Sequence, residues 1–233
     1  MGYHESLTEG RNAVLEAFRS GKTVDRLFVL DGCQDGPVKT ILREAKKQDT
    51  MVQYVKKERL DQLSETKNHQ GVIAYCAACE YAEVSDILEN AKKKGEAPFI
   101  VLLDGIEDPH NLGAIIRTAN QAGAHGVIIP KRRAVGLTAT VARTSAGAVN
   151  YTPVAKVTNL VTVMEDLKKE GMWFVCADMD GEEMYSLNLK GPIGLVIGNE
   201  GEGVSRLVKE HCDMVASIPM KGDIDSLNAS VAM

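Results

Sequence analysis

One segment of the sequence sets a charged residue on an apolar background. After the apolar run at residues 99–103, Asn111 lies where a helix N-cap is expected, and Arg117 follows on a helix otherwise made of Leu, Ala and Ile. Burying an unpaired charge is costly, so Arg117 is expected either to form an intramolecular salt bridge or to face an anion. The segment therefore predicts a structural ion pair or an anion-binding position.

A second segment is rich in glycine. Gly198, Gly201 and Gly203 follow the apolar run at residues 193–197, and glycine lets the backbone take positive φ and approach a ligand closely. The loop lacks the Lys-Ser/Thr of a Walker phosphate loop, and the carboxylates of Glu200 and Glu202 would repel phosphate. We therefore expect a neutral or cationic small molecule here.

A third segment places small polar residues among apolar ones near the end of the sequence. Ser226, Asn228 and Ser230 follow Ile218-Pro219-Met220, which ends another apolar run. Such residues donate and accept side-chain hydrogen bonds, and they also cap helices. A ligand contact and a plain helix cap are both open at this point.

The elements between these segments alternate in type. Expected strands are residues 99–103, 126–129, 172–177, 193–197 and 214–218, and expected helices are 112–122, 139–143, 160–170 and 204–211. The strand at 99–103 is almost wholly apolar, as a strand buried on both faces of a parallel sheet requires. A mostly parallel α/β sheet is predicted, and in such sheets ligands bind at the carboxyl ends of the strands, where all three segments lie.

The first part of the chain predicts a smaller α/β unit. Its expected strands are 26–30, 51–55 and 71–77, with helices at 38–47 and 58–64. A helix at 84–94 ends in three lysines and Gly95, which suit a helix C-terminus. We therefore expect a domain at 1–80, a linker and helix at 81–97, and a larger domain at 98–233.

Composition limits the class of protein. The 233 residues are 44% hydrophobic and 25% charged, and no apolar run approaches the ~18 residues of a membrane span. Five cysteines without paired spacing, including a lone Cys76-x-x-Cys79, argue against disulfides and a zinc site, and they favour the cytoplasm. The net charge of −5 disfavours binding to a polyanion unless basic clusters such as Lys56-Lys57-x-Arg59 act locally. Each cluster alone is equally consistent with a solvated face.

Together the three segments carry a family resemblance. Asn111-x-Gly113-x-x-x-Arg117, Ile197-Gly198-Asn199-Glu200-Gly201, and Ile218-Pro219-Met220 with Ser226-Leu227-Asn228-x-Ser230 resemble the three motifs of the SpoU (TrmH) family of RNA 2′-O-ribose methyltransferases. The resemblance covers residues 98–233. The runs Gly10-Arg11-Asn12-Ala13-Val14 and His69-Gln70-Gly71 are similar to the substrate-binding domain of members that act on ribosomal RNA, above all those that methylate a guanosine of 23S rRNA.

The resemblance implies an α/β trefoil-knot (SPOUT) methyltransferase domain, a homodimer, and S-adenosylmethionine as cofactor. It implies that Gly198, Asn199, Gly201, Ile218, Met220 and Leu227 bind the cofactor, and that Asn111, Arg117, Glu200, Ser226 and Asn228 form the catalytic set. Family proposals make the arginine a base. A guanidinium with a pKa above ~12 is a poor base, so we expect Arg117 to bind the phosphate beside the target ribose. In the family a further helix follows the third motif, and this sequence is expected to lack it.

Three alternatives are open, one that differs in substrate and two that differ in class. A tRNA ribose 2′-O-methyltransferase would carry the same motifs. A non-catalytic RNA-binding protein on the same fold would have no need of the five catalytic candidates together. A nicotinamide enzyme would need the fingerprint G-x-G-x-x-G, which this sequence lacks.

Overall fold

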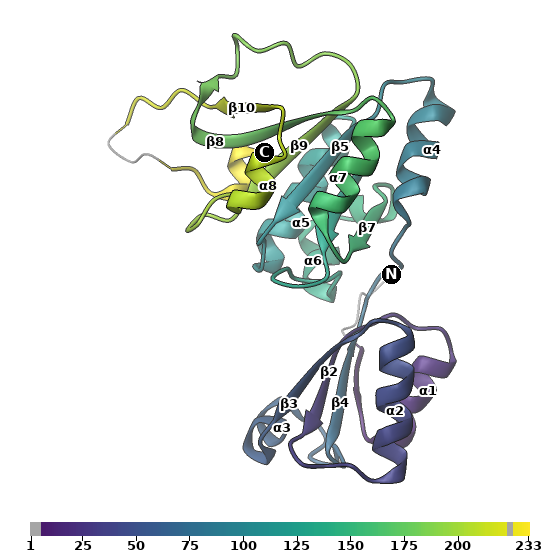
Figure 1. Cartoon of the computed structure of the whole chain (residues 1–233). Helices are drawn as coiled ribbons and strands as arrows, with labels where there is room; N and C mark the ends of the chain where they lie inside the picture. Colours follow the sequence, from purple (N-terminus) through teal and green to yellow (C-terminus); the bar gives the residue numbers. More distant parts are fainter. Residues whose placement is uncertain (1–5, 223–225) are drawn as a thin grey trace. The chain divides into compact units, whose positions relative to one another are not determined.

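The chain divides into two compact units in a computed structural model that describes residues 6–222 and 226–233 (Figure 1). The smaller unit comprises the described residues up to Glu80 together with Gly136–Ala139. The larger unit comprises Tyr81–Val135 and the described residues from Thr140 onward. We describe each unit by itself.

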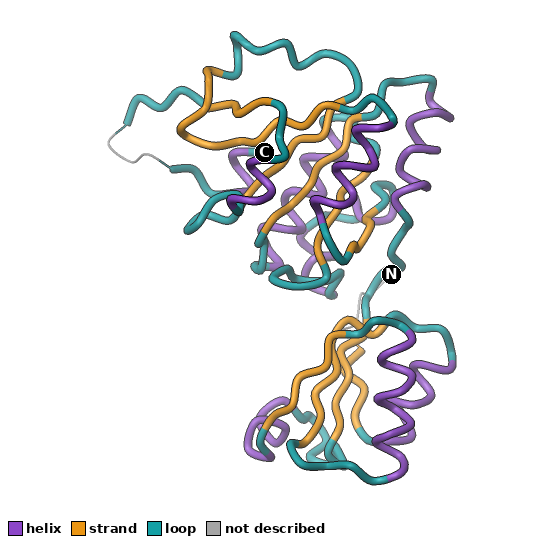
Figure 2. The backbone as a smooth tube through the Cα atoms, in the orientation of Figure 1, coloured by secondary structure: helices purple, strands orange, loops and turns teal. Residues whose placement is uncertain are grey.

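The smaller unit is a four-stranded sheet with helices on both faces (Figure 2). Its elements are β1 (Ser6–Glu9), α1 (Arg11–Arg19), β2 (Val24–Leu30), α2 (Gly36–Lys47), β3 (Met51–Val55), α3 (Lys57–Leu63) and β4 (Val72–Cys76). The strand order is β1-β4-β2-β3, with β2 parallel to β3 and antiparallel to β4. Alternation along β2 divides the core, because Leu27 and Val29 pack with α1 and α2 whereas Phe28 packs with Leu60 of α3.

The larger unit is built on a six-stranded sheet. Its elements are α4 (Val84–Lys94), β5 (Phe99–Asp104), α5 (Pro109–Gln121), β6 (Gly126–Pro130), α6 (Ala139–Thr144), a 3-10 turn η1 (Ala148–Asn150), β7 (Val154–Val157), α7 (Leu160–Lys169), β8 (Trp173–Glu183), β9 (Ile193–Gly198), α8 (Arg206–Glu210), β10 (Met214–Ser217) and α9 (Ala229–Ala232). The strand order is β10-β8-β9-β5-β6-β7, and every neighbouring pair is parallel. The predicted parallel α/β sheet is confirmed.

Helices cover this sheet in two layers. Ile100 and Leu102 of β5 pack with apolar residues of α4, α7 and α8 on one face, and α5 lies behind the strands on the other (Figure 1). Val101 and Leu103 point to the α5 face and are fully buried, as are Leu112, Ile115 and Ile116 of α5. Burial on both faces explains the apolar run that predicted β5.

Helix α4, which lies in the segment 81–97 expected to be a linker and helix, packs on the core of the larger unit. Ile87 is fully buried in the core against the sheet. A Cβ atom at Gly126 of β6 would lie 2.5 Å from a side-chain carbon of Ile87, so the absence of a side chain at 126 lets α4 approach the strand. The helix ends as predicted at Gly95, which adopts the left-handed conformation with φ of 67°.

The chain returns from the sheet edge to its middle after β10. Helix α9 contacts both α5 and β9, although β10 lies two strands away from β9. The trefoil knot implied by the resemblance depends on the path between β10 and α9. That path includes residues 223–225, which lie outside the described residues, so the knot stays a prediction.

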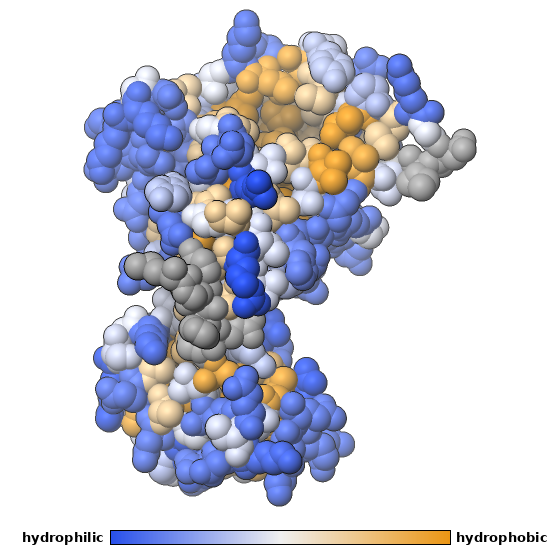
Figure 3. Space-filling model, turned by 180° about the vertical axis from the view of Figure 1, so that it is seen from behind, coloured by the Kyte–Doolittle hydropathy of each residue, from blue (hydrophilic) through white to orange (hydrophobic). Residues whose placement is uncertain are grey.

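Each helix in the described part of the chain is too short or too polar to cross a bilayer. Apolar side chains nevertheless reach the surface of the larger unit, where Figure 3 shows orange areas beside hydrophilic ones. Among the exposed apolar residues, Trp173 is 58% exposed, Met220 41% and Val231 65%.

Candidate functional site

The first two segments begin side by side at the carboxyl edge of the sheet. Asp104, the last residue of β5, pairs in register with Gly198, the last residue of β9. A carboxylate oxygen of Asp104 also accepts a 2.8 Å hydrogen bond from the backbone N–H of Ser205, which follows the glycine loop. The parallel topology and this hydrogen bond therefore hold the two loops together.

Three predicted site residues form one hydrogen-bonded cluster. Asn111 donates from Nδ2 to Oε1 of Glu200 at 2.5 Å, and Asn228 donates from Nδ2 to the same oxygen at 2.9 Å and to Oδ1 of Asn111 at 3.1 Å. The backbone N–H of Ala229 is 3.4 Å from that oxygen. Oε2 of Glu200 accepts no hydrogen bond from any described residue, so one carboxylate oxygen is fixed by the cluster and the other is left available.

Asn111 is not the helix N-cap that the sequence suggested. Asp108 caps α5, accepting a hydrogen bond from the backbone N–H of His110, and Pro109 occupies the first helical position. Asn111 therefore lies inside the first turn, 9% exposed. Its amide is free of the capping role and reaches Glu200 instead.

Asn228 does cap a helix, and it also joins the cluster. Its Oδ1 accepts hydrogen bonds from the backbone N–H of Ser230 at 3.0 Å and from the Ser230 hydroxyl at 2.6 Å. With its oxygen engaged by α9, its amide nitrogen points to Asn111 and Glu200. The two interpretations left open for this segment are thus compatible.

Contacts within the glycine loop fix its conformation. Oδ1 of Asn199 accepts hydrogen bonds from the backbone N–H groups of Gly201 and Glu202 at 2.9 and 2.7 Å. A Cβ atom at Gly198 would lie 2.0 Å from the carbonyl carbon of Gly203, so the strand end and the loop end are in contact. Of the three glycines only Gly203 has positive φ, at 67°, which corrects the expectation for the other two.

Two further glycines allow close contacts near the site, and neither packing role was predicted from the sequence. A Cβ atom at Gly105, whose φ is 79°, would lie 2.8 Å from Nδ2 of Asn199. A Cβ atom at Gly113 would lie 1.8 Å from the Thr144 hydroxyl oxygen, so α5 and α6 pack closely only because position 113 has no side chain. The signal in the sequence is a glycine inside a helix, which needs a packing reason.

Arg117 lies on the exposed side of α5 and forms no ion pair with any described residue. Of the two alternatives left open for this residue, the intramolecular salt bridge is therefore not formed among the described residues. Its apolar neighbours in sequence face the sheet, because a helix turns each successive side chain by about 100°. The guanidinium is free to meet an anion.

The other predicted residues lie at the end of β10 or just before α9. Ile218 and Leu227 are half-buried, while Met220 and Ser226 are exposed. Ser226 forms no hydrogen bond with any described residue, so the structure does not bring it into the cluster.

An ion pair that was not predicted from the sequence lies next to the glycine loop. Nζ of Lys209 lies 2.8 Å from Oδ2 of Asp178, and that oxygen is 3.9 Å from where a Gly203 Cβ would be. Desolvation raises the pKa of Asp178, but the hydrogen bond and charge of Lys209 and the backbone N–H groups of Asp180 and Met179 together outweigh it, so the pKa is lowered overall. Asp178 is therefore ionised, and Lys209 balances its charge in the ion pair.

Two family models match the chain. Residues 98–233 match the SpoU rRNA Methylase family, and residues 7–82 match the RNA 2′-O ribose methyltransferase substrate binding domain. A Bacillus subtilis strain 168 protein, YacO, whose name places it among TrmH family tRNA/rRNA methyltransferases, is 49% identical over 225 residues, covering 96% of this chain and 90% of that protein. A Staphylococcus haemolyticus protein similarly named is 46% identical over 224 residues, covering 96% and 90%.

Solved structures resemble the whole chain. The SpoU methyltransferase AviRb from Streptomyces viridochromogenes, crystallised with the cofactor AdoMet, has a TM-score of 0.60 and 26% identity, covering 98% of this chain and 86% of that one. A structure described as an RNA 2′-O ribose methyltransferase has a TM-score of 0.53 and 26% identity, covering 99% and 85%. An AdoMet-bound rRNA methyltransferase from Sinorhizobium meliloti, at 24% identity and a TM-score of 0.59, shares the fold.

Proposed function

Because the chain belongs to the SpoU rRNA methylase family, we propose that it transfers a methyl group from S-adenosylmethionine to a ribose 2′-hydroxyl of RNA. A guanosine of 23S rRNA is the proposed target, on the sequence resemblance to members with that substrate. The names of the curated relatives give both tRNA and rRNA, so the assay below includes both.

The observation that carries the proposal is the cluster of Asn111, Glu200 and Asn228. These residues come from three separate segments, and their side chains meet in one hydrogen-bonded group beside the carboxyl ends of β5 and β9. A purely structural role does not explain why the three residues meet. A helix cap or a tight turn in one segment does not require contact with the other two segments. A shared site explains all three.

The glycine loop fits S-adenosylmethionine better than a phosphorylated cofactor. Two of its backbone N–H groups, at Gly201 and Glu202, are already used by Asn199, and Glu200 and Glu202 add negative charge. When bound, S-adenosylmethionine supplies an electrophilic methyl group on a positively charged sulfur. Gly198, Asn199, Gly201, Ile218, Met220 and Leu227 are the residues that would hold it.

The reaction needs the weakly nucleophilic 2′-hydroxyl to be positioned and its proton accepted. The second carboxylate oxygen of Glu200, Oε2, can accept a hydrogen bond from that hydroxyl, and Asn111 and Asn228 fix the carboxylate through Oε1. Arg117 binds the phosphate beside the target ribose, since its guanidinium stays charged and offers a fork of donors that fits a phosphate. Ser226 completes the RNA contacts from the segment before α9.

The proposed partners are RNA and a second copy of the chain. The smaller unit matches a substrate-binding model, which supports RNA contact through it. Contact between α5 and α9, with exposed Val231 on α9, supports a homodimer formed through these helices. Five free cysteines suit a reducing compartment, and we propose that the enzyme acts in the cytoplasm.

The test is methyl incorporation from labelled S-adenosylmethionine into purified 23S rRNA, 16S rRNA and tRNA, each lacking prior modification. Nuclease digestion and mass spectrometry then identify the methylated nucleoside and its position. We expect 2′-O-methylguanosine in 23S rRNA. A product in tRNA alone would favour the tRNA enzyme, and RNA binding without methyl incorporation would favour the non-catalytic alternative.

A further inference from the structure

Two segments of the smaller unit that are far apart in sequence meet in space. The backbone N–H of Arg11 donates to Oε1 of Gln70 at 3.1 Å, and Nε of Arg11 donates to the Gln70 backbone oxygen at 3.0 Å. Arg11 also forms a 2.5 Å ion pair with Asp35, which fixes its side chain. Gln70 adopts a φ of 51°, which is uncommon outside glycine and marks a constrained position.

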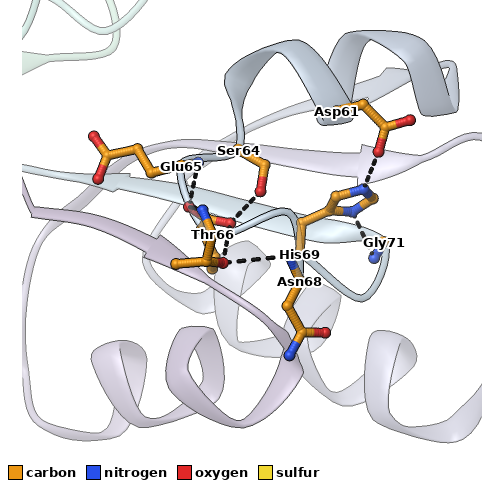
Figure 4. A network of polar contacts seen from close by, with 8 residues as sticks. Asp61, Ser64, Glu65, Thr66, Asn68, His69 and Gly71 are labelled. Atoms are coloured by element: carbon orange, nitrogen blue, oxygen red, sulfur yellow. Dashed lines mark hydrogen bonds and ion pairs between the residues drawn. The ribbon is translucent and has the colours of Figure 1, made fainter.

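The loop that carries Gln70 is fastened on two sides (Figure 4). The Glu9 carboxylate accepts hydrogen bonds from the Ser64 hydroxyl, from the Thr66 hydroxyl at 2.9 Å, and from the backbone N–H groups of Glu65 and Thr66 at 2.7 and 3.2 Å. Buried His69 contacts Asp61 at 3.0 Å and accepts from the Gly71 N–H at 3.0 Å. These contacts hold the loop in one conformation.

A groove of about 430 Å³ lies between the two segments. Its lining includes the apolar Leu7 and Ala13 and three amide side chains, those of Asn12, Asn68 and Gln70. The Asn68 amide points away from the network in Figure 4. The amides of Asn12 and Asn68 and the Nε2 group of Gln70 form no hydrogen bond with any described residue, so the groove offers free donors and acceptors on a rigid frame.

We propose that this groove binds one unpaired nucleobase of the RNA substrate, recognised by the amides of Asn12, Asn68 and Gln70. This inference rests on the proposed function for its ligand being RNA. Amide side chains carry a donor and an acceptor that match base edges, and proteins read RNA sequence mainly at unpaired bases. Leu7 and Ala13 offer apolar contact to the ring.

The charges around the groove favour a base over a phosphate. The four hydrogen bonds to Glu9 do not remove its negative charge, and the exposed carboxylate of Glu65 lies in the same lining. Arg11, a basic residue between the lining residues Gly10 and Asn12, is already paired with Asp35. A phosphate would meet two carboxylates and no free cation among the lining residues, whereas a neutral base suffers no repulsion.

The experiment measures binding of the full chain, without cofactor, to labelled 12-nucleotide RNAs by fluorescence anisotropy at several salt concentrations. The probes are single strands of oligo(A), oligo(C), oligo(U) and alternating G and U, and one 12-base-pair duplex. The variants are Asn12→Ala, Asn68→Ala and Asn12→Asp. Gln53→Ala, which removes an exposed amide of the same unit outside the groove, is the matched control.

We expect the wild type to prefer one single strand and to bind the duplex more weakly. Asn12→Ala and Asn68→Ala should each weaken binding to that strand by at least about fivefold, with the slope of log affinity against log salt unchanged, while Gln53→Ala has no effect. A wild type that binds all probes equally or none, or variants that lose only salt dependence, would overturn the proposal. If the base proposal is overturned but methyl transfer is intact, the proposed function stands without the base site. If the wild type binds one base selectively but transfers no methyl group, the base site stands without the proposed function.

Discussion

The side-chain amide of Asn111 donates a hydrogen bond to Oε1 of Glu200, 89 positions further along the chain. The bond joins the first turn of α5 to the glycine loop after β9. Asn228 bonds to both partners, so the cluster also ties α9 to this edge of the sheet. Changes in any of the three residues should therefore affect the geometry of the whole site.

Asn111→Asp should lower methyl transfer by about 100-fold at pH 8, because misplaced groups in a positioned site cost that much. The substitution replaces a donor with a second carboxylate beside Glu200. Like charges at this distance raise the pKa of one carboxyl group, so lowering the pH restores a proton and a hydrogen bond. The activity of the variant relative to wild type should therefore rise as the pH is lowered from 8 to 5.5.

The matched control is Asn120→Asp, on the same helix, whose amide donates to the Thr152 hydroxyl at 3.0 Å. A hydroxyl can donate in return, so this variant should keep near wild-type activity. Equal pH profiles for Asn111→Asp and wild type would contradict the role of the cluster.

Arg117→Ala should reduce methyl transfer by about 100-fold while S-adenosylmethionine affinity stays within twofold of wild type. The side chain is exposed and unpaired among the described residues, so the free energy of unfolding should change by less than about 0.5 kcal/mol. Arg117→Lys keeps the charge but loses the forked donors and should recover only part of the activity. Calorimetry measures the affinity for S-adenosylmethionine, and single-turnover assays measure the rate of methyl transfer. Equal losses of affinity and rate would refute the assignment of Arg117 to RNA binding.

Gly198→Ala should weaken S-adenosylmethionine binding and lower the unfolding temperature together. Its Cβ would lie 2.0 Å from backbone of Gly203, so the loop must move, and such overpacking costs about 1–3 kcal/mol. At Gly201 a Cβ would meet nothing closer than Oδ1 of Asn199 at 3.6 Å, so Gly201→Ala should leave stability unchanged. Loss of cofactor binding without loss of stability in Gly198→Ala would show that the glycine serves the ligand and not the loop.

Neutralising Lys56, Lys57 and Arg59 to glutamine should weaken rRNA binding and flatten its salt dependence. All three side chains are exposed. Each lost phosphate contact lowers the slope of log affinity against log salt by roughly 0.7–0.9. Arg11, another basic residue of the smaller unit, is paired with Asp35 and is left intact. The control removes the same charge from Lys92, Lys93 and Lys94 of α4, and an unchanged slope in the first variant would mean that this face is only solvated.

The chain should form a homodimer that buries more than ~1,200 Å². Helices α5 and α9 contact each other, and the larger unit exposes apolar residues that a dimer interface could bury. Light scattering on this chain measures the mass. Val231→Glu, which puts a charge on exposed α9, should weaken the dimer, and a monomeric wild type would sink the prediction.

Local patterns in the sequence were enough to predict most of the fold. Apolar runs marked β5, β6 and β9 because these strands are buried on both faces, and lysines before Gly95 marked the end of α4. The short β7 and the extension of β8 to Glu183 were missed, since edge or half-exposed strands carry a weaker pattern. The three motif segments were identified from residue types and order alone.

Only the tertiary structure decided how those residues are used. Asn111 became a cluster residue because Asp108 took the cap, and Arg117 stayed unpaired because the turn of α5 points it to solvent. Gly113 and Gly198 must lack a side chain because Thr144 and Gly203 lie against them, and no local pattern predicts these neighbours. Arg11 is bound to Asp35 and Gln70 and is no free phosphate ligand. The reason is common to all: local sequence sets which conformations a segment prefers, whereas the partners of a side chain depend on segments brought together by the sheet order.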